Sequence, residues 1–206
     1  MPGRKTTPRL GRGVYRRDPV TVARALLGQR LVHVVDGVRC AGLIVETEAY
    51  LGVQDRAAHS YGDRRTNRTA SMYADGGTAY VFMNYGIHFL LNVVVGRVDN
   101  PQAVLLRALE PTEGLQAMYA RRPKARRDTD LASGPGKLGA ALAVDRTHDG
   151  TDLVTSPTLF IEAARRRAMP GSRITVGPRI GVGYAGAWAK KPLRFHAKDH
   201  PHVSRA

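Results

Sequence analysis

Two segments rich in β-branched residues, joined by an aspartate–glycine pair, constrain the fold of this chain most. They read LVHVV-DG-VRCAGLIVETEAY, with Asp36 and Gly37 between them. Because Asp-Gly tolerates the positive φ angles of a tight turn, we expect the segments to pair as antiparallel strands. TAYVFM-NYG-IHFLLNVVV has the same form, and AVLLRAL (103–109) is typical of another strand. Hairpins without βαβ alternation predict an α+β fold, a single domain on a curved, largely antiparallel sheet with flanking helices.

The remaining chain predicts helices, late strands and one long loop. Asp18 can cap a helix, Pro19 suits its first turn and Gly28 can close it, so we expect a helix over 19–27. The polar, irregular stretch 51–77 is too long for an idle connection and suggests a functional loop. Two further helices are expected at 111–122 and 136–144, and three strands at 158–164, 173–177 and 193–197.

The charge balance favours a polyanionic partner. The chain has 32 Lys and Arg against 17 Asp and Glu, a formal net charge of +15. Nucleic acid is the first expectation and an anionic membrane surface the second, with a generally basic proteome as the alternative. The basic residues gather in several runs, at 4–17, 121–127, 165–167 and 190–191. Together they could neutralise several phosphates, and binding would then weaken steeply with salt.

Length and composition predict one intracellular, monomeric domain. The 206 residues are enough for one core. A basic, disordered arm over 1–13 is expected to precede a domain over 14–206. No apolar run approaches the ~20 residues that a membrane span needs. Cys40 is the single cysteine, so no internal disulfide can form, which fits a reducing compartment.

The stretch VETEAYLG places two carboxylates in a basic protein. On a strand Glu46, Glu48 and Tyr50 share one face, with the carboxylates about 7 Å apart along the backbone. Such a row is either part of a solvated ion-pair network or the wall of a reaction site. Most carboxylates on strands are exposed, so the ion-pair interpretation has the higher prior.

Tyr85 stands at the tip of the second predicted hairpin, between Asn84 and Gly86. Either the hairpin folds back and Tyr85 packs, or the ring is a wedge that enters DNA between base pairs. Below the tip, Phe82 either joins the core or forms a base-sized slot with Tyr50, since stacking a base on aromatic rings yields about 1–3 kcal/mol.

Two other motifs are discounted. GVGYAG (181–186) matches the dinucleotide fingerprint, but too little chain follows for the helix, strand and acid that the fingerprint needs. The histidines at 200 and 202 are too isolated for a zinc site. We expect neither a metal nor a cofactor.

Several long blocks resemble one known family. VETEAYLG...AAHS, GTAYVFMNYGIHFLLN, AVLLRALEPTEGL, SGPGKLGAAL and RIGVGYAGAWAKKPLRF are similar to the alkyladenine DNA glycosylases, the mammalian type of 3-methyladenine DNA glycosylase. The likeness runs from about residue 26 to 204. It implies a single domain with a curved antiparallel sheet and a protruding β-hairpin. It also implies excision of alkylated purines, namely 3-methyladenine and 7-methylguanine, from damaged double-stranded DNA, with hypoxanthine and ethenoadenine as further candidates.

The resemblance also implies residue roles. Glu48 matches the general base that activates the attacking water, Arg107 an arginine that helps to hold this water, and the backbone carbonyl of Ile180 the third water ligand. Glu46 matches no catalytic residue, so the ion-pair interpretation holds for it. Because Arg107 is expected beside Glu48, it should keep that carboxylate ionised.

For the base pocket the resemblance implies a sandwich. Tyr50 and His59 match residues on one face of the flipped base, and Phe82 matches the aromatic on the other face. Tyr85 matches an intercalating tyrosine, and Asn92 an asparagine that obstructs the exocyclic amine of guanine. Phe82 replaces the family's usual tyrosine, which bears on neutral lesions.

A cationic base would gain from the aromatic slot by cation–π attraction. No lysine occupies these motifs, so a monofunctional enzyme that leaves an abasic site is expected. The alternatives are a non-catalytic architectural nucleic-acid-binding protein that uses Tyr85 as a wedge, and a glycoside hydrolase. Adjacent glutamates on one face could not flank a glycosidic bond, which argues against the hydrolase.

Overall fold

An eight-stranded sheet organises the molecule in the computed structural model, which describes residues 7–204. Its main path runs β3-β4-β5-β2-β1-β6, and β8 pairs with both β2 and β7. The strands are β1 Arg30–Val35, β2 Val38–Tyr50, β3 Ala79–Asn84, β4 His88–Val95, β5 Gln102–Glu113, β6 Leu159–Glu162, β7 Ile174–Gly177 and β8 Arg194–Ala197. All pairings between these strands are antiparallel, as the hairpin pattern predicts.

The long strand β2 is the axis of the sheet. It follows the predicted turn, where Asp36 and Gly37 have φ angles of 50° and 75°. Along one edge β2 pairs first with β1 and then, over Glu46 to Glu48, with β8. Its other edge pairs with β5 and is irregular on both sides of Glu46. Since bulges bend a strand, the sheet curves where the two glutamates lie.

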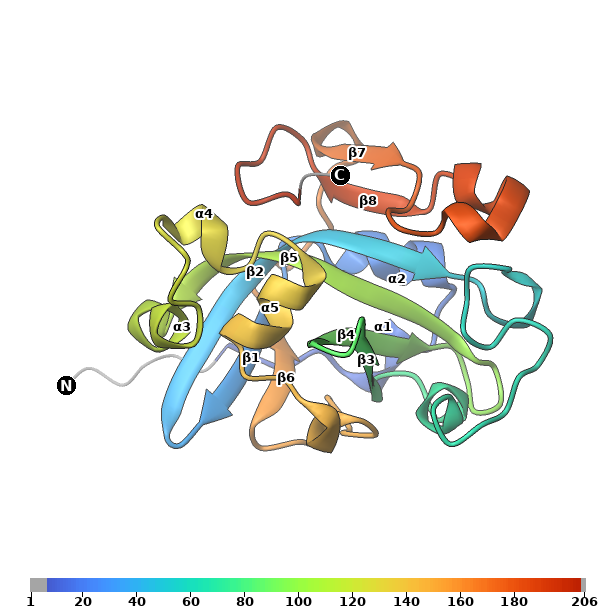
Figure 1. Cartoon of the computed structure of the whole chain (residues 1–206), viewed down its shortest axis with the longest axis horizontal. Coiled ribbons are helices and arrows are strands. Elements are labelled where there is room, and N and C mark those ends of the chain that lie inside the picture. The colour runs from blue at the N-terminus through green and yellow to red at the C-terminus, as the bar shows by residue number, and fades with distance from the viewer. Residues whose placement is uncertain (1–6, 205–206) are drawn as a thin grey trace.

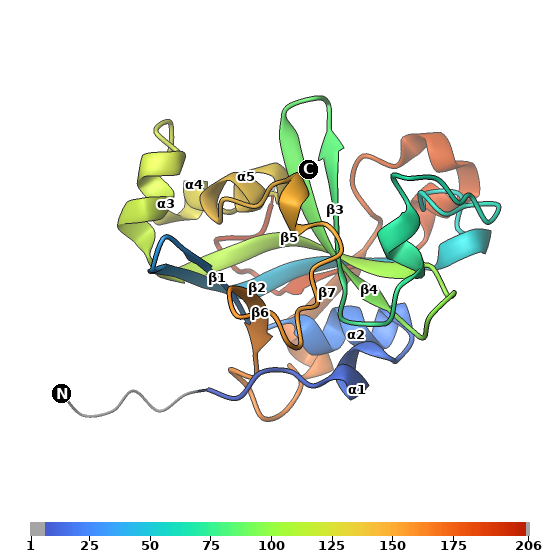
Figure 2. The same ribbon diagram turned by 90° about the horizontal axis from the view of Figure 1, so that it is seen from below.

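Helices cover both faces of the sheet (Figures 1 and 2). On one face lie α1 Arg12–Tyr15 and α2 Pro19–Leu26, and on the other α3 Leu115–Arg121, α4 Asp128–Leu131 and α5 Pro135–Ala141. The helix predicted from residue 19 is confirmed, because the Asp18 carboxylate accepts the Thr21 N–H at 2.9 Å. A core of fully buried aliphatic side chains joins these layers, among them Leu26, Ile44, Leu106, Leu109 and Leu138.

The hairpin of β3 and β4 projects from the sheet (Figure 2). Only the end of β4, Asn92 to Val95, pairs with β5, so the rest of the hairpin extends beyond the sheet edge. Helix α5 supports it from the side. A methyl group added at Gly139 would overlap the carbonyl oxygen of Phe89, and one at Gly136 would lie 2.8 Å from the His88 ring. The two glycines therefore let α5 approach the hairpin closely.

Two predicted helices have different limits. Residues 111–113 belong to β5, because Ala41 still pairs with Glu113. Helix α3 starts only after Gly114, whose φ is 74°. Helix α5 ends at Ala141, earlier than its apolar pattern suggests. The short helices α1 and α4 have too few residues for a detectable period and were missed.

The prediction of a disordered arm over 1–13 is wrong for its described part. The backbone of Arg9 forms an isolated antiparallel β-bridge with Glu162, Leu10 is buried and Arg12 begins α1. This segment therefore packs on the domain. The remainder of the predicted arm lies outside the described residues. Across residues 7–204 no helix has both the length and the apolar character needed to cross a membrane.

Candidate active site

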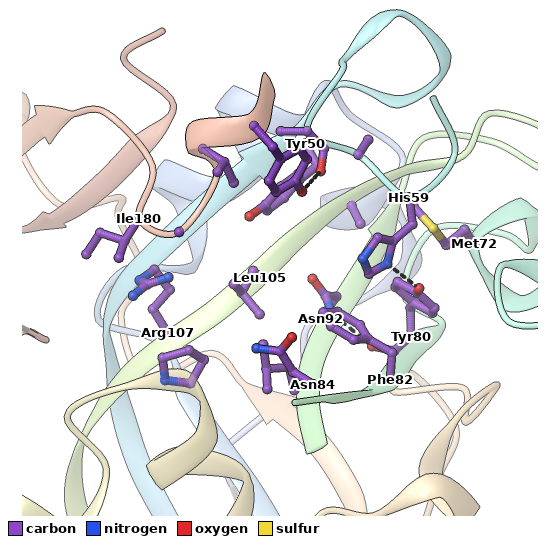
Figure 3. A pocket seen from close by; sticks show the side chains of 18 of the residues that line it. Tyr50, His59, Met72, Tyr80, Phe82, Asn84, Asn92, Leu105, Arg107 and Ile180 are labelled. Carbon is purple, nitrogen blue, oxygen red and sulfur yellow. Dashed lines mark hydrogen bonds between the residues drawn. The ribbon is translucent and has the colours of Figure 1, made fainter. Parts of the chain in front are cut away.

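A cavity of about 470 Å³ lies between the hairpin, the 51–77 loop and the segment that follows β7 (Figure 3). It is lined by seven of the eight residues predicted for the site, Tyr50, His59, Phe82, Tyr85, Asn92, Arg107 and Ile180. The structure therefore brings together residues that are spread over more than half of the chain. Glu48 does not line the cavity itself.

Glu48 lies one layer behind the cavity wall. Its side chain is completely buried, and each carboxylate oxygen has a partner. One oxygen accepts the Ile180 N–H at 2.8 Å and faces a guanidinium nitrogen of Arg107 at 3.2 Å. The other oxygen accepts the Tyr50 hydroxyl at 3.0 Å. Because these three partners all line the cavity, the carboxylate is separated from it only by groups that contact it.

Glu46 holds Arg107 in this position. It accepts hydrogen bonds from Arg107 Nε at 3.0 Å and Arg194 Nε at 2.6 Å, and two from Ser204. The prediction that Glu46 belongs to an ion-pair network is confirmed, but the network is buried rather than solvated. With Nε fixed by Glu46, the other end of the Arg107 guanidinium faces Glu48.

The two glutamates differ in acidity although they share an arginine. Burial raises the pKa of Glu48, and the charge of Arg107 only partly offsets this. The prediction that Arg107 keeps Glu48 ionised therefore underestimated desolvation. For Glu46, burial acts in the same direction, but the charge of Arg107, the bonds from Ser204 and the charge of Arg194 outweigh it. The pKa of Glu46 is lowered.

A glycine turn presents Ile180 to Glu48. Gly181 has a φ of 76°, and an added methyl group would have no non-neighbouring atom within 4 Å, so the backbone angle is what favours glycine. Ile180 was predicted to act through its carbonyl. The contact present in the structure is its N–H bond to Glu48, which the resemblance did not indicate.

Aromatic rings form opposite sides of the cavity, with Tyr50 across from Phe82 (Figure 3). The hydroxyl pKa of Tyr50 is raised well above its ordinary value by burial and by the charge of Glu48, so the hydroxyl remains a donor. His59 meets Phe82 edge-on, with ring centroids 4.5 Å apart and planes at 78°. Rings that sandwich a third must be about 7 Å apart, so His59 and Phe82 do not enclose a base in this arrangement.

Tyr80 connects three predicted pocket residues, although it was not itself predicted to belong to the pocket. Its hydroxyl lies 2.6 Å from Nδ1 of His59, and its carbonyl accepts the Asn92 amide at 3.1 Å. Its ring stacks obliquely on Phe82. Burial, followed by the charges of nearby arginines, lowers the pKa of His59 to about 4, so the imidazole is neutral at pH 7. The only feature of the sequence that pointed to Tyr80 as a pocket residue was that it shares a strand face with Phe82.

Tyr85 is 84 % exposed, which excludes the alternative that the hairpin tip packs on the domain. The Ile87 N–H donates to the Asn84 carbonyl at 3.2 Å, and both central residues of this turn have positive φ, 51° at Tyr85 and 71° at Gly86. A bulky residue at positive φ is uncommon and costs about 1–3 kcal/mol. Ile87, also exposed, adds a second apolar side chain to the tip.

A buried ion pair supports Tyr50 from behind and was not predicted. Arg179 and Asp55 are both inaccessible to solvent and form two hydrogen bonds to each other. Arg179 also donates to the Ala49 carbonyl at 3.0 Å. These residues are 124 positions apart, so no local pattern links them. Tyr184, exposed at the cavity mouth, was missed for the same reason.

An aromatic cavity, an acid directly behind its wall and an exposed apolar hairpin tip, in a chain of charge +15, are features of an enzyme that acts on the bases of nucleic acid. The comparisons with known proteins identify the class as DNA glycosylase. Residues 13–201 match the model of the methylpurine-DNA glycosylase family, and the chain belongs to this family.

Bacterial relatives match almost the whole chain. One from Bacillus cereus, named "Putative 3-methyladenine DNA glycosylase", is 44 % identical over 198 residues, 93 % of this chain and 96 % of the relative. One of the same name from Desulfitobacterium hafniense is 43 % identical over 203 residues, 95 % and 98 % of the two chains. The chain is thus a DNA glycosylase of the type that acts on alkylation damage.

Proposed function

We propose that the enzyme extrudes an alkylated purine from duplex DNA into the cavity and hydrolyses its N-glycosidic bond with a water activated by Glu48. The substrates would be 3-methyladenine and 7-methylguanine, with hypoxanthine and ethenoadenine as neutral candidates. The observation that supports this most is the placement of Glu48, whose three partners all line the cavity. The enzyme would act on DNA inside the cell.

In the proposed reaction the C1′–N9 bond breaks and its electron pair stays on the base. The water oxygen bonds to C1′ and its proton passes to Glu48, whose ionised form also stabilises the positive charge on the sugar. Glu48 is enclosed in the free enzyme, so the water must enter beside Arg107 and Ile180. Arg107 and the Ile180 carbonyl are proposed as its further ligands.

Base selection is proposed to combine several weak effects. Tyr50 and Phe82 offer ring faces to the base, while Asn92 would obstruct the exocyclic amine of guanine. Asn92 suits this role because it is 3 % exposed and fixed by its bond to Tyr80. Tyr85 would fill the space that the base leaves, and unpairing costs least for damaged bases. Phe82 lacks the hydroxyl of a tyrosine, so its ring offers no hydrogen-bond donor to the base.

The proposed enzyme is monofunctional. No lysine is among the residues that line the cavity within the described chain, so no amine is placed to form an imine with the sugar. The product would be an abasic site, which alkali then cleaves.

Replacement of Glu48 by Gln tests the role of the base. We expect single-turnover excision of 7-methylguanine to fall at least ~100-fold, the usual contribution of a general base. Because burial dominates the raised pKa of Glu48, the neutral amide should not destabilise the fold, and the melting temperature should equal or exceed that of the wild type. Strand cleavage after alkali and thermal melting are the two measurements.

Glu110→Gln is the matched control, since Glu110 is a partly exposed carboxylate on β5 and does not line the cavity. It should retain wild-type excision. Undiminished excision in a well-folded Glu48→Gln variant would remove Glu48 as the base. A wild-type protein that binds lesion-bearing duplexes without excision would favour the architectural alternative.

A further inference from the structure

An arginine lies against each aromatic wall of the cavity. The guanidinium carbon of Arg179 is 4.6 Å from the ring centroid of Tyr50, and that of Arg68 is 5.3 Å from the centroid of Phe82. Both distances are within the ~6 Å range of cation–π attraction. Neither arginine is among the residues that line the cavity, so each acts on the cavity through the ring that it contacts.

Arg68 contacts Phe82 beside a second hollow. The two residues line this hollow of about 340 Å³ on the surface, so the Phe82 ring separates it from the base cavity. Arg68 itself is exposed. Asp149 lines the same hollow, but its carboxylate accepts hydrogen bonds from Ser71 and Val81. Among the described residues no salt bridge compensates the charge of Arg68, whereas Asp55 compensates that of Arg179.

The positive charge of Arg68 reaches the cavity. After burial, it is the largest cause that lowers the pKa of His59, and Arg64 adds to it. The site therefore disfavours a second positive charge at the position of His59, whose ring contacts Phe82. A cationic base stacked on Phe82 would lie in the same field.

Neutral and cationic purines respond to this field in opposite ways. When the C1′–N9 bond of a neutral purine breaks, the electron pair leaves the base with negative charge, which nearby arginines stabilise until solvent protonates it. A base alkylated at N3 or N7 enters as a cation and departs neutral, so the same arginines oppose its entry. Relative to the unflipped duplex, the field lowers the barrier for neutral purines, whereas for cationic ones the penalty on entry is relieved as the base loses its charge, so they gain nothing from the field.

We infer that Arg68, whose charge no salt bridge compensates among the described residues, determines specificity by shifting the enzyme toward neutral damaged purines such as hypoxanthine. The inference rests on the proposed base excision and concerns the relative rates on two lesion classes. The positive charge of Arg68 also offsets the cation–π preference that the aromatic rings alone would give to alkylated cations.

Arg68→Gln tests the inference, with Arg68→Lys as the charge-conserving variant. Matched duplexes carry either hypoxanthine or 7-methylguanine, and single-turnover rates are measured at saturating enzyme and one pH. We expect Arg68→Gln to lower the hypoxanthine to 7-methylguanine rate ratio about two- to fivefold. Arg68→Lys should keep the wild-type ratio. Saturating enzyme and the ratio together cancel any general loss of DNA affinity.

Arg65→Gln is the control. Arg65 is on the same loop, stacks on Tyr73 at 3.9 Å and pairs with Asp99, and Tyr73 does not line the cavity. Its ratio should stay at the wild-type value. An unchanged ratio in Arg68→Gln, an equal fall in Arg68→Lys, or wild-type excision confined to 7-methylguanine overturns the inference. If the wild type excises neither lesion, the proposed function itself fails.

Discussion

Glu46 and Glu48 contact the same arginine, yet their hydrogen bonds give them different chemistry. Glu46 is surrounded by two arginines and by both the amide and the hydroxyl of Ser204, which suit a permanent anion. Glu48 has one arginine, one amide and one phenol, and burial outweighs them. A carboxylate with fewer compensating partners is more basic, as proton abstraction from water requires.

The pH dependence of excision should reveal this difference. The base must be ionised, so activity is expected to fall as pH decreases through the raised pKa of Glu48, above the ordinary ~4.3 of glutamate. His59 remains neutral down to about pH 4 and should not contribute at higher pH. Excision rates of 7-methylguanine at limiting enzyme, measured against pH, locate this acid limb. A limb below the ordinary glutamate range would point to Glu46 instead, because its pKa is lowered.

At the scale of elements, the hairpin and α5 form one mechanical unit. Beyond the β4–β5 pairing the hairpin has little sheet support, so the close approach of α5 fixes the direction of its tip. Tyr85 then projects at a fixed place beside the cavity that it lines. Gly139 is therefore important to the proposed wedge although it does not line the cavity.

Gly139→Ala should displace the hairpin. The added methyl group would overlap the Phe89 carbonyl oxygen, and one of the two backbones must shift. We expect the melting temperature to fall, since overpacking costs about 1–3 kcal/mol. Base extrusion, followed by the fluorescence of a 2-aminopurine next to the lesion, should weaken as in Tyr85→Ser. Tyr85→Ser should itself leave the melting temperature unchanged, because the ring is exposed. Wild-type extrusion in Gly139→Ala would show that α5 does not position the tip.

The sequence was most informative where structure is local. The Asp36-Gly37 turn and the Asp18 cap each depend on neighbouring residues, and both are present as predicted. Helix limits near Gly114 were missed because sheet pairing with Ala41, a distant residue, extends β5. For the site, the resemblance located the cavity residues, but not that Glu48 is enclosed. Desolvation depends on every element around a residue, and no motif encodes it.

At the scale of the whole molecule, the charge of +15 sets how the enzyme meets DNA. Exposed arginines of the 51–77 loop, Arg56 and Arg64, lie on the segment that also supplies cavity residues. The basic surface therefore reaches the cavity, and the phosphates on either side of an extruded nucleotide can be neutralised there.

DNA affinity should decrease steeply with salt. If about six phosphates are neutralised, raising salt from about 50 to about 200 mM should weaken binding roughly 1,000-fold. Fluorescence anisotropy with a lesion-bearing duplex measures this slope, and single-turnover excision at saturating enzyme should change far less. A slope near zero would mean that the net charge is not used for DNA binding.

The contact between Ser204 and Glu46 joins the last described residue of the chain to the proposed reaction centre. Glu46 orients Arg107 and Arg107 faces Glu48, so two side chains separate this residue from the proposed base. A purification tag fused just after Ser204 would disturb the hydrogen bonds between Ser204 and Glu46, and turnover should fall although no cavity residue is changed.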